Sequence, residues 1–239
     1  MQLLTVPNIA DVASRAAGIV CEALAQRPDA HLCLAAGGTP RPLYGELCRR
    51  AEAGEAALLQ ARITKLDEWC GVSMDDPASC EDDLRVHLLT PLGIPAERYI
   101  GFDSMASDPE AECRRVADLV AAAGPFDLSV LGLGLNGHIG MNEPADELPP
   151  GVHVAKLAEQ SRRHAMLREI AEPPTTGFTM GMADLMHSGK VLLIVTGEAK
   201  REALARLIHG PITTRFPASL LKLHRDCICI ADATAAQQV

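Results

Sequence analysis

The stretch Phe126-Asp-Leu-Ser-Val-Leu-Gly-Leu-Gly-Leu-Asn-Gly-His138 joins a strongly apolar run to a loop of glycine and polar residues. The run, residues 126–133, has the length and composition of a buried strand. Residues 31–36, 63–66 and 191–195 repeat this arrangement, because each is a strand-like run followed directly by a polar or glycine-containing segment. The repeated pattern predicts several strands that each end in a polar cluster.

Helix-like segments separate these runs along almost the whole chain. Apolar residues at helical spacing follow an Asn8 cap and continue to Leu24. Further helices are expected at residues 43–51, 80–92, 108–123, 163–170 and 198–209, and further strands at 99–102, 152–157 and 227–230. Alternating strands and helices are typical of a mostly parallel sheet flanked by helices on both faces. The sequence therefore predicts an α/β fold, a single doubly wound, Rossmann-like domain over residues 1–239.

Composition excludes several classes of function. A formal net charge of −9, with no run of Lys and Arg, argues against a nucleic-acid partner or an anionic membrane surface. Apolar runs such as 191–195 are far shorter than the ~20 residues of a membrane-spanning helix, so no membrane partner is expected. The first ten residues carry no export signal, so a cytoplasmic protein is expected.

The eight cysteines are expected to be free thiols, because several lie in apolar-periodic segments of a chain that resembles an intracellular protein. Cys227 and Cys229 are spaced as alternate residues of a strand, with both thiols on one face. No second pair accompanies them, so no metal site is predicted.

Polar groups at the carboxyl ends of parallel strands are expected to share one crevice. Gly37-Gly38-Thr39-Pro40 follows the strand at 31–36 and is suited to hold a phosphate, since glycine permits close backbone approach at a helix N-terminus. The four residues by themselves equally fit a tight turn in which Thr39 caps the helix and Pro40 is its first residue. Lys200, after the strand at 191–195, is either a phosphate ligand or a surface lysine.

Two further clusters carry acid-base groups. Asp67 and Glu68 directly follow the strand at 63–66, where the alternative is a solvated acid pair at a helix start. The loop after residue 133 holds His138 and Glu143, and the carboxylate is placed to orient the imidazole and raise its basicity. A lone histidine beside an apolar strand is more often structural, but this one is flanked by glycine and followed by a carboxylate.

These clusters, in this order, resemble the glucosamine-6-phosphate deaminase family. Lys65-Leu-Asp-Glu-Trp69 and Gly137-His-Ile-Gly-Met-Asn-Glu-Pro144 are the specific matches, and the likeness runs from about Leu32 to Ala231. Within the family, the chain looks closest to galactosamine-6-phosphate isomerases, judged by these motifs together with Val195-Thr-Gly-Glu-Ala-Lys200 and Pro217-Ala-Ser219. The resemblance implies an enzyme that isomerises and deaminates a hexosamine 6-phosphate.

The resemblance also implies roles for particular residues. His138, assisted by Asn136 and Glu143, would open the sugar ring, and Asp67 would move the proton between neighbouring carbons. The phosphate would lie on Gly37, Gly38, Thr39 and Lys200, with help from Arg168. The substrate's own carbonyl accepts the electrons, so no cofactor is expected, and the only partner expected is the sugar phosphate, with a homo-oligomer left open.

Three positions depart from the family pattern. Asn136 stands where many members have Asp, Ala36 where a hydroxyl residue is common, and Arg168 aligns with the family's arginine only after a small shift. Asn136 can still orient His138 by hydrogen bonds without carrying charge.

Two other functions compete with this interpretation. A 6-phosphogluconolactonase shares the superfamily, but typically has Asp-Glu-Arg and a Thr-Ala-Ser-Leu-Phe-like segment where this chain has Asp67-Glu-Trp69 and residues 139–144. A non-catalytic sugar-phosphate sensor would be joined to a DNA-binding segment, and none is recognised in this acidic chain. The motifs do not distinguish galactosamine from glucosamine 6-phosphate, which differ in the orientation of one hydroxyl. They also leave open an isomerisation that releases no ammonia.

Overall fold

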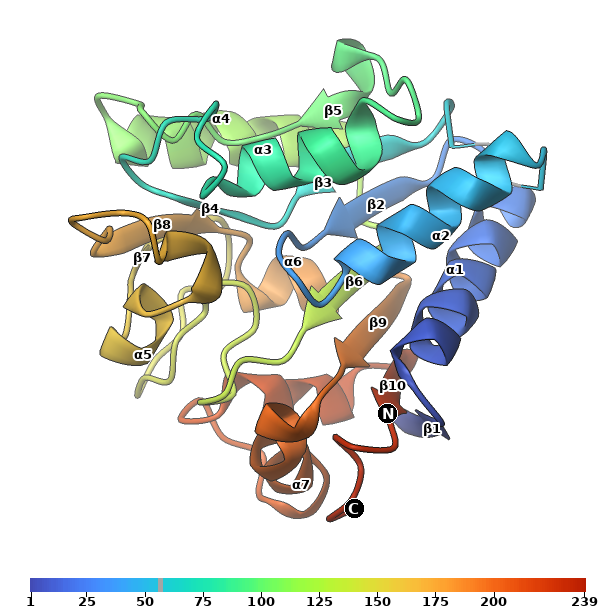
Figure 1. Cartoon of the computed structure of the whole chain (residues 1–239). Helices are drawn as coiled ribbons and strands as arrows, with labels where there is room; N and C mark the ends of the chain where they lie inside the picture. Colours follow the sequence, from blue (N-terminus) through green and yellow to red (C-terminus); the bar gives the residue numbers. More distant parts are fainter. Residues whose placement is uncertain (56–57) are drawn as a thin grey trace.

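Parallel strands form the central sheet of the computed structural model, which describes residues 1–55 and 58–239 (Figure 1). In spatial order the sheet contains β1 (Gln2–Val6), β10 (Cys227–Asp232), β9 (Lys190–Val195), β6 (Leu128–Gly132), β2 (His31–Leu34), β3 (Arg62–Lys65) and β5 (Tyr99–Ile100). The strands pair in parallel throughout. From β2 the chain adds β3 and β5 on one side, and then β6, β9 and β10 on the other. The strand order therefore reverses between β2 and β6, which is where such sheets open a ligand crevice.

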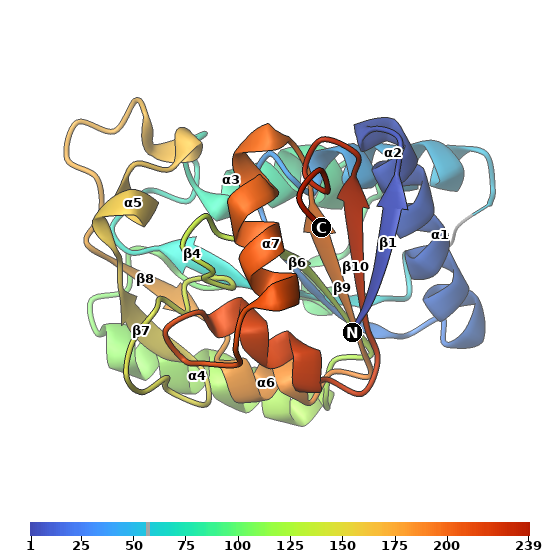
Figure 2. The same ribbon diagram turned by 90° about the horizontal axis from the view of Figure 1, so that it is seen from below.

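Helices cover both faces of this sheet (Figure 2). The helices are α1 (Ile9–Gln26), α2 (Arg41–Glu52), α3 (Cys80–Leu84), α4 (Pro109–Ala123), α5 (Glu159–Arg162), α6 (Met182–Met186) and α7 (Arg201–His209). The other helical segments are the π segment η1 (Arg85–Leu89) and the 3₁₀ segments η2 (Ala96–Arg98), η3 (Ala165–Leu167), η4 (Glu198–Lys200) and η5 (Pro217–Leu223). One apolar layer contains α1, α2 and α3, and the other contains α4, α6 and α7. The predicted doubly wound α/β fold is confirmed.

Side chains on the central strands alternate between these two layers. Leu192 and Ile194 of β9 pack with α1 and α2, whereas Leu193 packs with α7 on the other face. Cys227 and Cys229 of β10 both lie in the α7 layer, as their spacing predicted. The alternation follows from the two-residue period of a strand, and it buries both faces of the sheet.

A second, antiparallel sheet was not predicted from the sequence. It contains β4 (Asp67–Trp69), β8 (Thr176–Thr179) and β7 (His153–Lys156), with β8 in the middle. The chain passes into it at Leu66, whose N–H donates to Leu34 O at 3.0 Å and whose carbonyl accepts from Met180 N at 2.9 Å. Asp67 therefore begins a strand of the second sheet and does not lie in a loop. It follows the carboxyl end of β3 in the central sheet.

Several predicted elements differ in extent. The helix expected at 80–92 is α3 followed by the π segment η1. Within the range 163–170, where a helix was expected, only the short η3 is helical, and α5 ends just before that range. Strand β1 was missed because its residues are exposed or only partly buried at the sheet edge. Asn8 caps α1 as predicted, and its side chain accepts from Asp11 N at 3.0 Å. Within the residues described, no helix combines the length and apolar character needed to cross a bilayer.

Phe178 of β8 tests how the two sheets are joined. Its side chain is fully buried, stacks on Phe102 with ring centroids 5.4 Å apart, and belongs to the same apolar cluster as Leu193 of the central sheet. We expect Phe178→Ala to lower the free energy of unfolding by about 3–5 kcal/mol, because it leaves a cavity between the sheets. Urea unfolding measures the loss, and Phe178→Leu should lose less. A loss below about 1 kcal/mol for Phe178→Ala would contradict this packing.

Candidate active site

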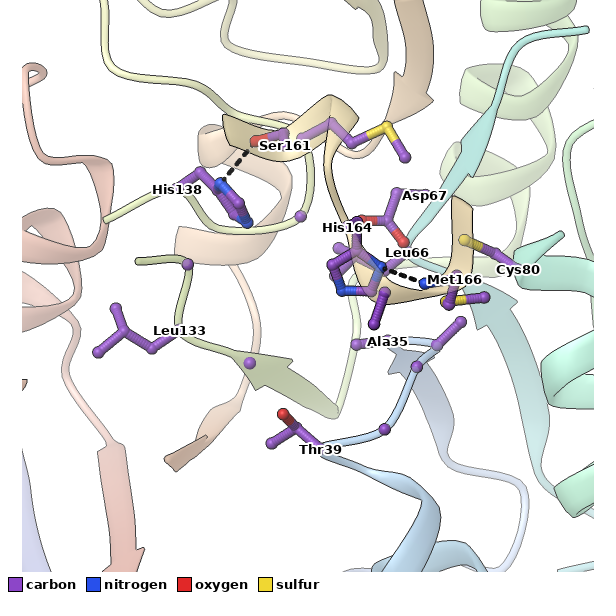
Figure 3. A pocket seen from close by; sticks show the side chains of 18 of the residues that line it. Ala35, Thr39, Leu66, Asp67, Cys80, Leu133, His138, Ser161, His164 and Met166 are labelled. Carbon is purple, nitrogen blue, oxygen red and sulfur yellow. Dashed lines mark hydrogen bonds between the residues drawn. The ribbon is translucent and has the colours of Figure 1, made fainter. Parts of the chain in front are cut away.

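A cavity of about 260 Å³ opens where the strand order reverses (Figure 3). Its walls come from the segments that follow β2 and β6, from the start of β4, and from the α5–η3 segment that lies across it. The predicted residues that line it are Gly37, Gly38, Thr39, Asp67, His138, Glu143 and Lys200. Groups separated by more than 130 residues of sequence are therefore brought to one site.

The glycine turn after β2 has a backbone conformation that favours glycine. Gly37 has φ of 100°, a conformation that side-chain-bearing residues rarely adopt, and its N–H donates to Asp83 Oδ2 at 2.7 Å. The buried Asp83 also accepts from Arg41 Nε at 2.5 Å, which fixes the first turn of α2. Helix α2 begins at Arg41, after Pro40, without a side-chain cap. The alternative in which Thr39 caps this helix is therefore wrong, and Thr39 lines the cavity.

Lys200 reaches the cavity from η4. Its ammonium donates to Leu133 O at 2.5 Å, at the end of β6. Burial lowers the pKa of Lys200. The surface-lysine alternative is therefore wrong, and Lys200 supplies a cation beside the glycine turn.

His138 and Glu143 lie together in the loop after β6. His138 Nδ1 is 3.6 Å from Glu143 Oε2 and 3.2 Å from Ser161 Oγ of α5. Burial by itself would raise the pKa of Glu143, but the hydrogen bond and charge of His138, helped by Ser161 and Asn136, lower it to about 2. Glu143 is thus a carboxylate that orients the imidazole.

Asn136 bridges the two partners. Its Nδ2 donates to Glu143 Oε2 at 2.8 Å, and its Oδ1 accepts from His138 N at 3.0 Å. An aspartate at this position has no N–H to give to Glu143, so the amide suits a neighbour that is itself ionised. Gly134 completes the arrangement, because a Cβ there would lie 2.4 Å from the His138 ring.

Asp67 faces the cavity from the first position of β4 (Figure 3). Burial, and after it the nearby charge of Glu68, raise the pKa of Asp67 to about 7, while the charge of Lys65 opposes both. A carboxyl group with a pKa near 7 can accept and return a proton at neutral pH. Glu68 itself points away from the cavity lining and accepts from Cys80 N and Glu81 N, at 2.9 and 2.8 Å.

The α5–η3 segment contributes residues that the sequence did not single out. Ser161, Arg163, His164 and Met166 line the cavity, and His164 lies against Trp69 with ring centroids 5.8 Å apart. Their sequence shows only a short basic and polar run inside a segment predicted to be helical. The segment lines the cavity because α5 and η3 cross it, which no local pattern indicates.

Arg168 is not brought to this cavity. Its side chain is exposed one residue after η3, because the neighbouring Leu167 takes the buried side of the turn. Arg163 is the arginine of this segment that lines the cavity, and it pairs with Glu159. Nor do three or more His, Cys, Asp or Glu residues gather into a metal-ligand cluster anywhere in residues 1–55 and 58–239.

The burial of Asp67 has a consequence for stability. Because its folded-state pKa of about 7 lies above the ordinary value of 3.8, the folded protein binds this proton more tightly than the unfolded chain does. Stability from this group is complete below pH 4 and is lost as the pH rises through 7. We expect Asp67→Asn to raise the free energy of unfolding by about 1–3 kcal/mol at pH 8 and to change it little at pH 4. Urea unfolding at both pH values measures this, and an equal effect at both would contradict the inference.

Comparisons with known proteins agree with this arrangement. A family model described as glucosamine-6-phosphate isomerases/6-phosphogluconolactonase matches residues 8–229. "Putative deaminase AgaI" of Escherichia coli (strain K12) is 38% identical, over 95% of this chain and 90% of that protein. Glucosamine-6-phosphate deaminase 1 of Bacillus subtilis (strain 168) is 35% identical, over 99% of this chain and 97% of that protein.

Solved structures show the same likeness. A structure described as a monomeric glucosamine-6-phosphate deaminase of the NagB superfamily has a TM-score of 0.96 at 34% identity and covers 100% of both chains. A 6-phosphogluconolactonase from Trypanosoma cruzi has a TM-score of 0.82 at 18% identity, covers 100% of this chain and 96% of its own, and shares the fold alone. This chain belongs to the glucosamine-6-phosphate isomerase/6-phosphogluconolactonase family.

Proposed function

We propose that this protein converts a hexosamine 6-phosphate, galactosamine 6-phosphate or glucosamine 6-phosphate, into the ketose 6-phosphate and ammonia. The observation that carries the proposal is one cavity holding two acid-base groups of different character. Asp67 has a pKa raised to about 7, whereas Glu143 is held ionised beside His138. Environments that separate the proton affinities of neighbouring groups are typical of acid-base enzymes. Relatives at 34–38% identity named as deaminases support the same reaction.

Ring opening is assigned to His138 with Glu143 and Asn136. The anomeric hydroxyl must lose a proton and the ring oxygen must gain one before the aldehyde appears. Because Nδ1 of His138 lies near Ser161 and Glu143, Nε2 is the nitrogen we assign to the sugar. The ionised Glu143 stabilises the imidazolium that forms while the proton is in transit.

Proton transfer between carbons is assigned to Asp67. Its carboxylate removes the proton from C2 of the open aldehyde, the electron pair moves to the carbonyl oxygen, and that oxygen takes up a proton, which gives an enolamine. Asp67 returns its proton to C1 while the amine's lone pair forms the C2=N bond, which leaves a protonated ketimine at C2. Water adds to the ketimine, and ammonia leaves. Galactosamine 6-phosphate thereby yields tagatose 6-phosphate, and glucosamine 6-phosphate yields fructose 6-phosphate.

The phosphate is assigned to Gly37, Gly38, Thr39 and Lys200. The Gly37 N–H already donates to Asp83, so Gly37 shapes the turn, and the N–H groups of Gly38 and Thr39 are the ones assigned to the phosphate. Lys200 adds a positive charge from the β6 side. Holding the phosphate keeps a flexible open-chain sugar in reacting geometry. The role of Arg168 stays a prediction, since its side chain is outside the cavity in this structure.

The first test replaces the proposed base. We expect Asp67→Asn to lower kcat for ammonia release by about 10²–10⁴-fold, since an amide cannot accept the C2 proton. For wild type, kcat/KM should rise with pH through about 7, as Asp67 loses its proton. Coupled assays of ammonia and ketose phosphate, with both amino sugars and 6-phosphogluconolactone in parallel, provide the measurement.

Asp75→Asn is the matched control, because the Asp75 side chain is 87% exposed and lies outside the cavity lining. It should retain wild-type kcat. Turnover of the lactone alone would assign the chain to hydrolysis, and equal ammonia release by wild type and Asp67→Asn would remove Asp67 from the mechanism.

The second test concerns the phosphate site. We expect Lys200→Met to raise KM for the sugar phosphate by about 10–100-fold and to weaken inhibition by inorganic phosphate, because a charge-assisted contact is lost. Lys222→Met is the control, since Lys222 also donates to backbone carbonyls, of Ile208 and Gly210, but away from the cavity. Similar KM changes in both variants would contradict the assignment.

A further inference from the structure

Lys65 is a fully buried cation two residues before the proposed base. Its side chain is 0% exposed, and its ammonium lies 2.7 Å from Glu68 Oε2 and 2.6 Å from Glu81 Oε2. Burial by itself would lower its pKa, but Glu68 and Glu81 outweigh this and raise it, so the ammonium stays charged. A buried charge of this kind is costly unless each partner is well placed.

The two glutamates connect Lys65 to the elements that carry the cavity wall. Glu68 Oε1 accepts from Trp69 N and Cys80 N, and its Oε2 accepts from Glu81 N, which ties β4 to the first turn of α3. Glu81 accepts from the Tyr99 hydroxyl of β5 at 2.7 Å. Lys65 thus lies at the junction of β3, β4, α3 and β5, two residues before Asp67.

Other titratable groups around Asp67 do not supply this charge. The pKa of each of Cys33, Tyr44 and Cys80 is raised well above its ordinary value, first by burial, so these groups are neutral. Burial lowers the pKa of His164, which lines the cavity from η3 (Figure 3). The remaining charged groups are acids and cations of the surrounding elements: Glu68 on β4, Glu81 and Asp83 on α3, Asp184 on α6, Arg41 on α2, His138 and Glu143 after β6, and Lys200 on η4.

We propose that Lys65 is a positioning residue for the reaction, which holds Glu68 in place and offsets the negative charge that Glu68 directs at Asp67. Without this cation, the negative charge of Glu68 would act on Asp67 unopposed. Asp67 would then ionise only at higher pH, and less of the enzyme would carry the base at neutral pH. The inference rests on the proposed function for its kinetic consequence, but its electrostatic consequence can be measured without turnover.

The test compares variants that change the charge behind Asp67 in opposite directions. Lys65→Met removes the cation, and we expect the pKa of Asp67 to rise by about 1 unit. Glu81→Gln removes one anionic partner and leaves more of the Lys65 charge to act on Asp67, so the pKa should fall. The double variant Lys65→Met/Glu81→Gln removes the cation but leaves Glu68 with its three backbone donors, so it is the variant to use if Lys65→Met does not fold.

The first readout is the pKa of the Asp67 carboxyl carbon by ¹³C NMR, assigned by its loss in Asp67→Asn. The second is the acidic limb of kcat/KM, which should move with that pKa, so that kcat/KM at pH 6 falls about tenfold in Lys65→Met. Lys190→Met is the matched control, because Lys190 is also ion-paired, with Asp226, but begins β9 at the opposite end of the sheet. It should leave both readouts unchanged.

Opposite shifts in the Lys65 and Glu81 variants support the proposal. An Asp67 pKa that stays within 0.2 units of wild type in Lys65→Met or the double variant, with kcat lowered equally at every pH, overturns it and leaves Lys65 a purely structural role. If wild type releases no ammonia from either sugar, the proposed function fails, whereas the NMR comparison still decides the role of Lys65.

Discussion

The passage of the chain from one sheet to the other at Leu66 is the constraint on which the site depends. The backbone of Leu66 extends the β2 ladder through its N–H and joins the second sheet through its carbonyl. Both groups are satisfied although the chain leaves the central sheet, which a buried backbone requires. Asp67 is the next residue, so its carboxylate is placed at the carboxyl end of β2 and β3 by main-chain hydrogen bonds and not by a flexible loop.

The electrostatics of the cavity follow from what lies behind each acid. Asp67 is desolvated with Glu68 beside it, which raises its pKa, whereas Glu143 receives hydrogen bonds and faces His138, which lowers its pKa. Two carboxyl groups of similar intrinsic acidity thereby acquire different proton affinities within one cavity. Because the pKa of Asp67 is raised and that of Glu143 is lowered, we assign proton transfer between carbons to Asp67 and support of the imidazole to Glu143.

The glycine-rich loop after β6 shows how a local pattern serves a tertiary contact. Gly134 leaves room for the His138 ring, and Asn136 connects that residue to Glu143 through both ends of its amide. The departure from the aspartate common in the family is thus accommodated by hydrogen bonding instead of charge. Ser161 reaches His138 from a segment more than 20 residues away, so the imidazole is held by two parts of the chain.

The sequence by itself determined the parallel α/β fold, because strand and helix periodicities are local properties. Most of the site residues that it named line the cavity, because motifs at strand ends converge in such sheets. It did not indicate the second sheet, since β4 has only three residues and the pairing of β8 joins residues about 110 positions apart. Nor did it indicate that Arg163 and His164 face the cavity, or that Lys65 is buried between Glu68 and Glu81. Those features were decided by tertiary structure alone, because burial and electrostatic partners depend on which distant segments pack together. The residue pattern of one strand does not indicate which segments will lie beside it.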